Sequence, residues 1–269
     1  MHYNYVFCIL VYRNTQDILE CIESIKENVK DYKILIVNSY YDDESMHEFR
    51  NIAKTNNCDF LNVENRGYGY GNNMGIQFAI EHYSFDYIVV SNPDIIIEKF
   101  DDLLLKQFNQ SVIAPIINNI SGKPQNPYWI KKNVLAENLI YRGQKEKKRL
   151  LLYSGYAINK LFREIGLKLF LKSQKNEMKV YAAHGSFCIF PKSIFETLGK
   201  LYDEEMFLFA EEAYVAHILE SNNIDTILTK EIVIRHKEDG SVKISKINED
   251  DELRKSVIYY YEKLGLNQR

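Results

Sequence analysis

Asp94 stands at a position where a carboxylate could bind a ligand. It follows Asn92 and Pro93 at the end of a short apolar run, residues 87–91. Such a run suits a strand buried on both faces, and Pro93 ends it because proline has no N–H for a sheet ladder. Open α/β sheets bind ligands at the carboxyl ends of their strands. We predict that Asp94 holds a divalent cation, which holds a nucleotide diphosphate; a plain Asn-Pro-Asp turn is the alternative, and the tripeptide alone does not decide.

Two adjacent carboxylates, Glu211 and Glu212, open a predicted helix in the second half of the chain. The partial positive charge of a helix N-terminus stabilises acids in this position. Ordinary first-turn acids are therefore the alternative to a functional pair.

Two histidines stand in or next to predicted strands. His236 directly follows residues 232–235, and His184 lies with Gly185 and Ser186 inside the run 180–191. For His236, a backbone hydrogen bond at the strand end is the alternative to a role in binding. His184 is expected to be a structural histidine with satisfied hydrogen bonds.

Three glycines in five residues, Gly67, Gly69 and Gly71, separate the third predicted strand from a helix. Glycines let a backbone approach a ligand closely, and the helix N-terminus that follows offers N–H groups to a phosphate. The segment is not a dinucleotide fingerprint, because GxGxxG would need glycine at Asn72 and belongs after the first strand. A flexible surface loop is the alternative.

Short strands and helices alternate through the first 95 residues, which implies right-handed crossovers and a parallel sheet. Thr15 is the expected N-cap of the first helix. The apolar patterns predict strands at 5–11, 33–37, 58–63 and 87–91, and helices over about 15–29, 44–54 and 72–82.

The second half is less regular. The expected elements are a helix at 100–108, strands at 111–117, 180–191, 225–229 and 232–235, a helix capped by Ser193, a helix from Glu211, and a C-terminal helix over 245–264. Residues 128–178 resist assignment and carry basic clusters beside apolar runs. This pattern is more typical of a solvated helix face, and contact with an anionic membrane surface is the alternative.

Composition excludes several classes of protein. A net charge of -3 argues against a nucleic-acid partner. The four cysteines form no CxxC pair, so neither a zinc site nor a disulfide framework is expected and a reducing cytosol fits best. No apolar window approaches the roughly 18 residues of a membrane span, and no leader pattern opens the chain. A cytoplasmic protein is expected, with peripheral contact at the inner membrane face and homo-oligomerisation left open.

Seven segments in order resemble family 2 glycosyltransferases with the GT-A fold, in particular bacterial enzymes of capsule, exopolysaccharide and O-antigen assembly. They cover most of residues 3–241. The segments are YVFCILVYRN, NRGYGYGNNMGI, SNPDIII, APIINNISGKPQ, AHGSFCIFPKSIF, MFLFAEEAYVAHIL and RHKEDGS.

The resemblance implies roles for the matched positions. Asp94 would be the last residue of the family's DxD metal motif, with Asn92 at the first position, as in rhamnosyltransferase-type members. His236 would complete the metal or diphosphate site around Mn²⁺ or Mg²⁺. Glu212 would be the catalytic base, with Glu211 before it. The other implied contacts are to the donor base (Tyr12, Asn38), to the rest of the donor (Asn65, Gly67, Asn73) and to the acceptor (His184, Gly185, Ser186).

Two positions depart from the family pattern. Asn38 replaces the Asp that reads uracil in many members, which weakens an inference to a uridine donor, and Tyr214 replaces a carboxylate two residues after the base. The expected partners are a UDP- or dTDP-sugar donor and a saccharide or lipid-linked acceptor.

We therefore expect an α/β protein whose mostly parallel sheet is flanked by helices. Residues 1–242 would form the GT-A domain, with a nucleotide-sugar half at 1–117 and an acceptor half at 118–242, and 243–269 a helical extension. The expected function is inverting, metal-dependent sugar transfer in cell-surface glycan synthesis. The alternative is a non-catalytic sugar-nucleotide-binding or scaffold subunit. A nucleotidyltransferase would need a basic phosphate-binding motif near the first strand, which Arg13 alone does not make.

Overall fold

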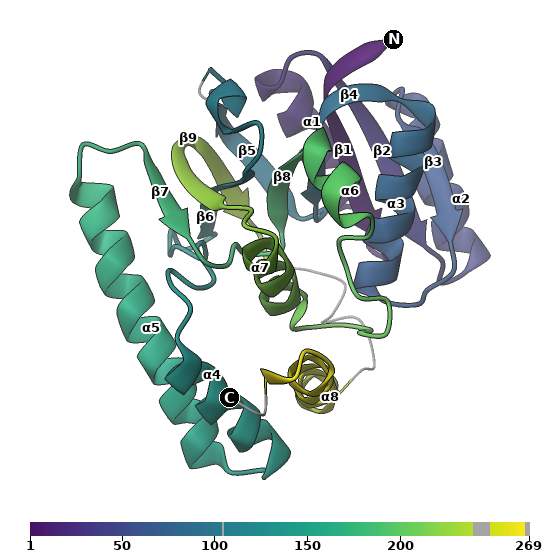
Figure 1. Cartoon of the computed structure of the whole chain (residues 1–269). Helices are drawn as coiled ribbons and strands as arrows, with labels where there is room; N and C mark the ends of the chain where they lie inside the picture. Colours follow the sequence, from purple (N-terminus) through teal and green to yellow (C-terminus); the bar gives the residue numbers. More distant parts are fainter. Residues whose placement is uncertain (104, 239–247, 267–269) are drawn as a thin grey trace.

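Nine strands form one sheet in the computed structural model, which describes residues 1–103, 105–238 and 248–266 (Figure 1). The strands are β1 His2–Val11, β2 Tyr32–Ser39, β3 Asp59–Val63, β4 Ser84–Ser91, β5 Ile95–Phe100, β6 Val112–Asn119, β7 Glu177–Val180, β8 Phe187–Pro191 and β9 Thr226–His236. The helices are α1 Asp17–Asn28, α2 Asp43–Thr55, α3 Tyr68–His82, α4 Val134–Lys145, α5 Arg149–Lys172, α6 Lys192–Leu198, α7 Glu211–Ser221 and α8 Glu249–Lys263, with a 3₁₀ turn η1 at Leu105–Phe108.

The sheet has a parallel half and a mixed half. The strand order is β3-β2-β1-β4-β8-β6-β9-β5, with β7 paired to β9. The first four strands are parallel, as predicted. Beyond β4, β8 and β5 join antiparallel neighbours, while β6 and β9 are parallel to each other. The carboxyl ends of β1, β2 and β4 therefore meet at one edge of the sheet.

Burial on both faces explains the continuous apolar runs of the first half. In β1, Phe7 and Ile9 pack in one core cluster with α1 and α2, whereas Val6 and Cys8 pack in a second cluster with α3 and α6. Successive strand residues point to opposite faces, so a strand covered on both sides needs apolar residues throughout.

The segment that resisted assignment forms two helices. α4 and α5 make a hairpin, and α5 runs along one side of the molecule (Figure 1). A third core cluster joins α4 to α8, with Tyr141 stacked on Tyr261 at a ring distance of 4.9 Å. None of the helices in the described ranges is long and apolar enough to cross a membrane.

Several element predictions were wrong. The helix expected at 100–108 is the end of β5 followed by η1. Of the strand expected at 180–191, only Val180, the last residue of β7, and β8 are in strands, and residues 181–186 form the connection between them. The two strands expected at 225–229 and 232–235 are one strand, β9, with a register shift where it pairs with β6.

Neither expected hydroxyl cap forms. Gln16 precedes α1 and Pro191 precedes α6, and the Ser193 hydroxyl donates to the Asn109 carbonyl instead. The C-terminal helix begins at Glu249, and residues 245–247 of its predicted range lie outside the described residues. The division of the domain at residue 117 stays a prediction.

Candidate active site

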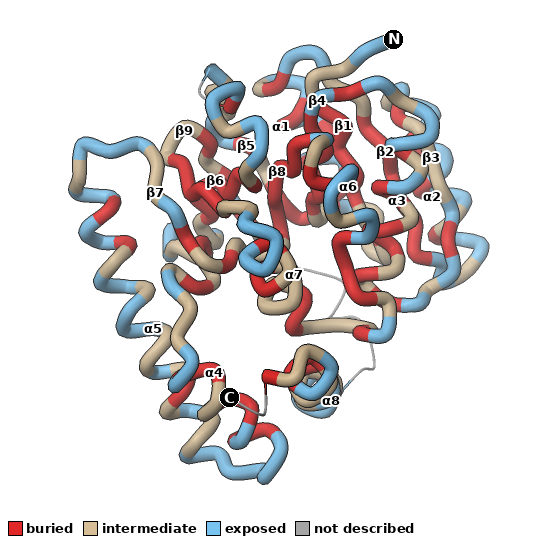
Figure 2. The backbone as a smooth tube through the Cα atoms, viewed as in Figure 1, coloured by how far each residue is buried: buried red, intermediate tan, exposed pale blue. Residues whose placement is uncertain are grey.

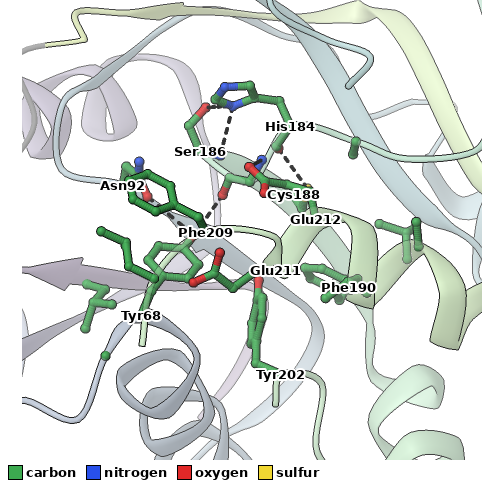
Figure 3. Close-up of a pocket in the computed structure, with 18 of the residues that line it drawn as sticks. Tyr68, Asn92, His184, Ser186, Cys188, Phe190, Tyr202, Phe209, Glu211 and Glu212 are labelled. Carbon is green, nitrogen blue, oxygen red and sulfur yellow. Dashed lines mark hydrogen bonds between the residues drawn. The ribbon is translucent and has the colours of Figure 1, made fainter. Parts of the chain in front are cut away.

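A cavity of about 310 Å³ opens at the carboxyl edge of the parallel half of the sheet. Tyr12 after β1, Ser39 at the end of β2, and the Asn92–Asp94 turn after β4 line one side. The start of α7, with Glu211 and Glu212, lines the other side (Figure 3). The sheet edge and α7 thus bring together the two groups of residues that the sequence singled out.

Asp94 and His236 face each other across the β5–β9 ladder, in which Ile95 is the partner of His236. Asp94 Oδ1 lies 3.3 Å from His236 Nε2, and both side chains are buried. Asp94 Oδ1 has no hydrogen-bond partner among the described residues. An ionised carboxylate oxygen left without a partner in a buried site is costly, which points to a ligand that the protein does not itself supply.

The orientation of the His236 ring is fixed by a hydrogen bond at its other nitrogen, Nδ1. His236 Nδ1 lies 2.9 Å from Gln125 Oε1, and Gln125 Nε2 donates to Glu238 Oε1 at 2.6 Å. Because the Gln125 amide nitrogen is used toward Glu238, its oxygen accepts the proton of His236 Nδ1, and Nε2 is the ring nitrogen that faces Asp94. An outer partner that orients a histidine in this way is usual around metal ligands. The partner of His236 Nδ1 is thus a side chain, whereas the alternative for this histidine was a hydrogen bond to the backbone.

Asp94 and His236 therefore fit a hard divalent cation as an incomplete ligand set. Carboxylate oxygen and imidazole nitrogen both bind such ions. Within the described ranges no group of three His, Cys, Asp or Glu side chains converges on one point. A cation here would need further oxygen ligands from a bound diphosphate or from water.

Glu211 and Glu212 sit in different surroundings at the start of α7. The Gly185 N–H donates to Glu212 Oε1 at 3.4 Å, whereas Glu211 is 5% exposed and its Oε1 has no partner within the described part of the chain. Burial and the neighbouring charge of Glu212 raise the pKa of Glu211 to about 8. Burial also raises the pKa of Glu212, against the lowering effect of the α7 backbone and the Gly185 N–H. With a pKa of about 8, Glu211 holds a proton at neutral pH.

The backbone before this pair is strained. Phe209 and Ala210 both have positive φ, 72° and 66°, in the left-handed region that costs side chains other than glycine about 1–2 kcal/mol per residue. Helix α8 holds the segment in place, because Ser256 donates to the Leu208 carbonyl at 2.7 Å and Lys263 Nζ donates to Asp203 Oδ2 at 2.6 Å. No pattern in the sequence indicated that the C-terminal helix contacts the loop before α7.

His184 matches the structural alternative more closely than a binding role. Its Nδ1 accepts from the Ser186 N–H at 3.2 Å and its backbone N–H donates to Asn126 Oδ1 at 3.0 Å. Burial, with the neighbouring His236 second, lowers the pKa of His184 to about 4, so the ring is neutral. His184, Gly185 and Ser186 nevertheless all line the cavity.

Tyr68 is a site residue that the sequence reasoning missed. Its hydroxyl donates to the Gly185 carbonyl at 2.9 Å and lies 3.4 Å from Asn92 Oδ1, which links α3 to both sides of the cavity (Figure 3). Its place directly after Gly67 was the available signal.

The glycines at the start of α3 serve packing within the protein. Helix α3 begins at Tyr68, so Gly69 and Gly71 lie in its first turn and not in a loop. A Cβ atom on Gly67 would lie 2.3 Å from the Phe207 carbonyl oxygen, and one on Gly69 would lie 2.8 Å from the Asp203 oxygen. The expected close approach to a ligand is thus replaced by close approach to the 203–207 segment, although Gly67 and Asn65 still line the cavity.

Two residues implied as donor contacts do not line the cavity. Asn73 binds the Tyr202 backbone through both its amide nitrogen and its oxygen, at 2.9 and 3.1 Å. Asn38 is fully buried and donates to Asn62 Oδ1 at 2.6 Å. Tyr12 does line the cavity, and its ring lies 5.6 Å from that of Tyr41, edge to face.

Residues 6–199 match the family described as Glycosyl transferase family 2. The chain belongs to this family. A relative in Haloferax volcanii, the low-salt glycan biosynthesis hexosyltransferase Agl10, is 30% identical over 190 residues, which are 68% of this chain and 53% of that protein. The chain of this family 2 member thus spans about half the length of that relative.

Solved structures share the GT-A-type fold of this family 2 chain. GalNAc-T7, solved with UDP, GalNAc and Mn²⁺, has a TM-score of 0.61 at 11% identity over 87% of this chain and 44% of its own. S. aureus TarS has a TM-score of 0.55 at 11% identity over 87% of this chain and 36% of its own. Its fragment 1–349 has a TM-score of 0.53 at 9% identity over 96% of this chain and 70% of its own. At these identities the likeness concerns the fold alone.

Proposed function

We propose that this chain transfers a sugar from a nucleotide-sugar donor to an acceptor hydroxyl, with inversion at the anomeric carbon and with dependence on a divalent cation. The observation that carries the proposal is the placement of the unpartnered Asp94 Oδ1, facing His236 Nε2, in the same cavity as Glu212. The family and the hexosyltransferase relative in glycan biosynthesis support sugar transfer. The UDP and Mn²⁺ in GalNAc-T7 support the class of donor and of metal.

Asp94 and His236 would hold the cation, with Gln125 orienting the histidine ring so that Nε2 faces Asp94. Bound there, Mn²⁺ or Mg²⁺ supplies a positive charge that stabilises the diphosphate as it leaves. Asn92, whose Oδ1 lies 3.4 Å from the Tyr68 hydroxyl, fixes the turn that carries Asp94.

Glu212 is the proposed base. An acceptor hydroxyl is a poor nucleophile, so a carboxylate must take its proton as the oxygen bonds to the anomeric carbon and the bond to the diphosphate oxygen breaks. Such base catalysis contributes about 10²–10⁴-fold to the rate. Glu211 keeps its own proton, and the Gly185 N–H orients the Glu212 carboxylate.

The nucleotide base is proposed to lie near Tyr12 at the end of β1. The Tyr41 ring lies edge-on to Tyr12 and carries the Arg13 guanidinium 3.9 Å from its centre. This cluster offers an aromatic and cationic surface for a UDP- or dTDP-sugar.

The non-catalytic alternative drew on the departures at Asn38 and Tyr214. Neither residue is among those that line the cavity in the described part of the chain. Their identities therefore do not argue against transfer.

Substitution of the base tests the proposal. Glu212→Gln should lower the rate of transfer or of sugar-nucleotide hydrolysis by about 10²–10⁴-fold while UDP binding in Mn²⁺ is retained. Glu205→Gln, an exposed acid in the preceding loop, is the matched control and should leave the rate unchanged. A Glu212→Gln protein that turns over at the wild-type rate would exclude Glu212 as the base. If the wild-type protein hydrolyses none of the sugar nucleotides, the alternative of a non-catalytic binding subunit would be favoured.

A further inference from the structure

The outer side of α5 is an apolar surface that the described protein does not cover. Leu161, Phe162, Ile165 and Leu169 are 59%, 61%, 52% and 66% exposed. Their spacing places them on one side of the helix, and we call these four residues the α5 stripe. Figure 2 shows exposed residues along the length of α5. Large apolar side chains gathered on one surface mark an interaction site more often than scattered ones do.

The opposite side of α5 is fixed to the body, so the helix cannot simply roll over to bury the stripe. A Cβ on Gly155 would lie 2.7 Å from the Ala136 carbonyl oxygen, which shows how closely α5 approaches α4. Near the other end, Leu167 and Phe170 are buried in a cluster with Leu228 of β9. The stripe is therefore a stable outward surface.

The charge around the stripe is strongly positive. Residues 145–175 contain nine basic and two acidic residues, a net charge of +7, whereas the whole chain carries -3. Lys168 and Lys172 follow Leu161 by seven and eleven residues and so lie on the same side of the helix. Lys168, Lys172 and Arg149 are exposed, and none has an acidic partner within the described ranges.

We propose that α5 docks flat on an anionic lipid bilayer, with the α5 stripe in the headgroup region and the flanking cations at the lipid phosphates. An amphipathic helix with an apolar face and basic flanks binds membranes in this way, and each Lys or Arg near an anionic surface adds to the attraction. A second copy of the chain is a poorer occupant, because two segments of charge +7 would repel each other. This inference is independent of the proposed catalytic function.

Vesicle flotation of the full chain tests the proposal. The protein should float with phosphatidylcholine vesicles that contain phosphatidylglycerol, should bind weakly to phosphatidylcholine alone, and should be released as salt is raised. Phe162→Ser should lower the partition coefficient about tenfold. The double substitution Lys168→Glu with Lys172→Glu should lower it about thirtyfold or more.

Matched controls distinguish loss of the α5 surface from a general change in the protein's charge or hydrophobicity. Leu19→Ser, at a 47% exposed position on α1, and Lys30→Glu with Lys54→Glu, at exposed lysines of the other half, should leave vesicle binding unchanged. Circular dichroism should show the same helix content in all variants. Absence of binding to anionic vesicles, or equal loss in the control variants, would overturn the proposal. So would a wild-type dimer in solution that Phe162→Ser converts to a monomer.

Discussion

Gln125 accepts the Nδ1 proton of His236 while its own amide donates to Glu238, so one side chain decides which histidine nitrogen faces Asp94. Gln125→Leu removes that constraint without touching either proposed metal ligand. We expect the Kd for Mn²⁺ in the presence of UDP to rise about 10–100-fold, measured by titration calorimetry. Gln77→Leu, on an exposed face of α3, should have no effect. An unchanged affinity in Gln125→Leu would remove His236 from the metal site.

The protonated Glu211 predicts a pH dependence of stability. Its pKa in the folded protein is about 8, raised from 4.5. The unfolded chain therefore binds fewer protons between these values, so this contribution is fully present below pH 4.5 and is lost as pH rises through 8. His184, with its pKa lowered to about 4, acts in the opposite direction below pH 6.5.

The window from pH 6.5 to 8.5 lies above the range in which His184 titrates and includes the pKa of Glu211. Thermal unfolding should show a Tm that falls over this range in the wild type and falls less in Glu211→Gln. Glu196→Gln, an exposed residue on α6, should follow the wild-type curve. Parallel curves for Glu211→Gln and the wild type would mean that the buried carboxyl is already ionised.

Gly67 has both a positive φ of 105° and no room for a side chain beside Phe207. Gly67→Ala should lower the free energy of unfolding by about 2–4 kcal/mol, because left-handed strain and a backbone clash add. Gly122→Ala shares the positive φ, 76°, but meets no atom within 4 Å, and should cost only about 1 kcal/mol. Chemical denaturation compares the two. Equal losses would show that the clash is relieved by movement of the 203–207 segment.

Lys263 reaches from α8 to the buried carboxylate of Asp203. Lys263→Met would remove the cationic partner of that carboxylate and leave the Glu205 backbone N–H, at 3.1 Å, and the Tyr259 hydroxyl, at 3.4 Å. The substitution should destabilise the protein by about 1–3 kcal/mol. It should also lower kcat, because the 203–210 segment leads directly into Glu211 and Glu212. Lys255→Met breaks the ion pair of an exposed lysine with the partly buried Glu252 and should change neither quantity measurably. A stable Lys263→Met protein with normal kcat would show that α8 does not support the loop.

The predictable parts of the molecule are those whose local pattern matches their environment. The sequence of strand β4 is a continuous apolar run because both faces of the strand are covered. The strand ends at Ser91, near the end that Pro93 predicts. Asp94, His236, Glu211 and Glu212 could be singled out because each is a polar residue at the end of an apolar run or the start of a helix.

The remainder depended on contacts distant in sequence. Whether glycines approach a ligand or another segment cannot be read from spacing, and Gly67 meets Phe207, 140 residues away. In sequence Asn73 resembles a polar site residue, but in the fold its amide nitrogen and oxygen both bind the Tyr202 backbone. Strand β9 looks like two strands because Lys230 and Glu231 interrupt its apolar pattern where the register shifts.

The two left-handed residues before α7 set a limit on how this protein can vary in length. One residue inserted between Ala210 and Glu211 would rotate the helix that follows by about 100° relative to the kink. Both carboxylates would then turn away from Gly185 and the cavity, even though every side chain was conserved. Insertions and deletions that keep both carboxylates in the cavity must therefore fall outside the step from Phe209 to Glu212, because this short segment sets the position of the proposed base.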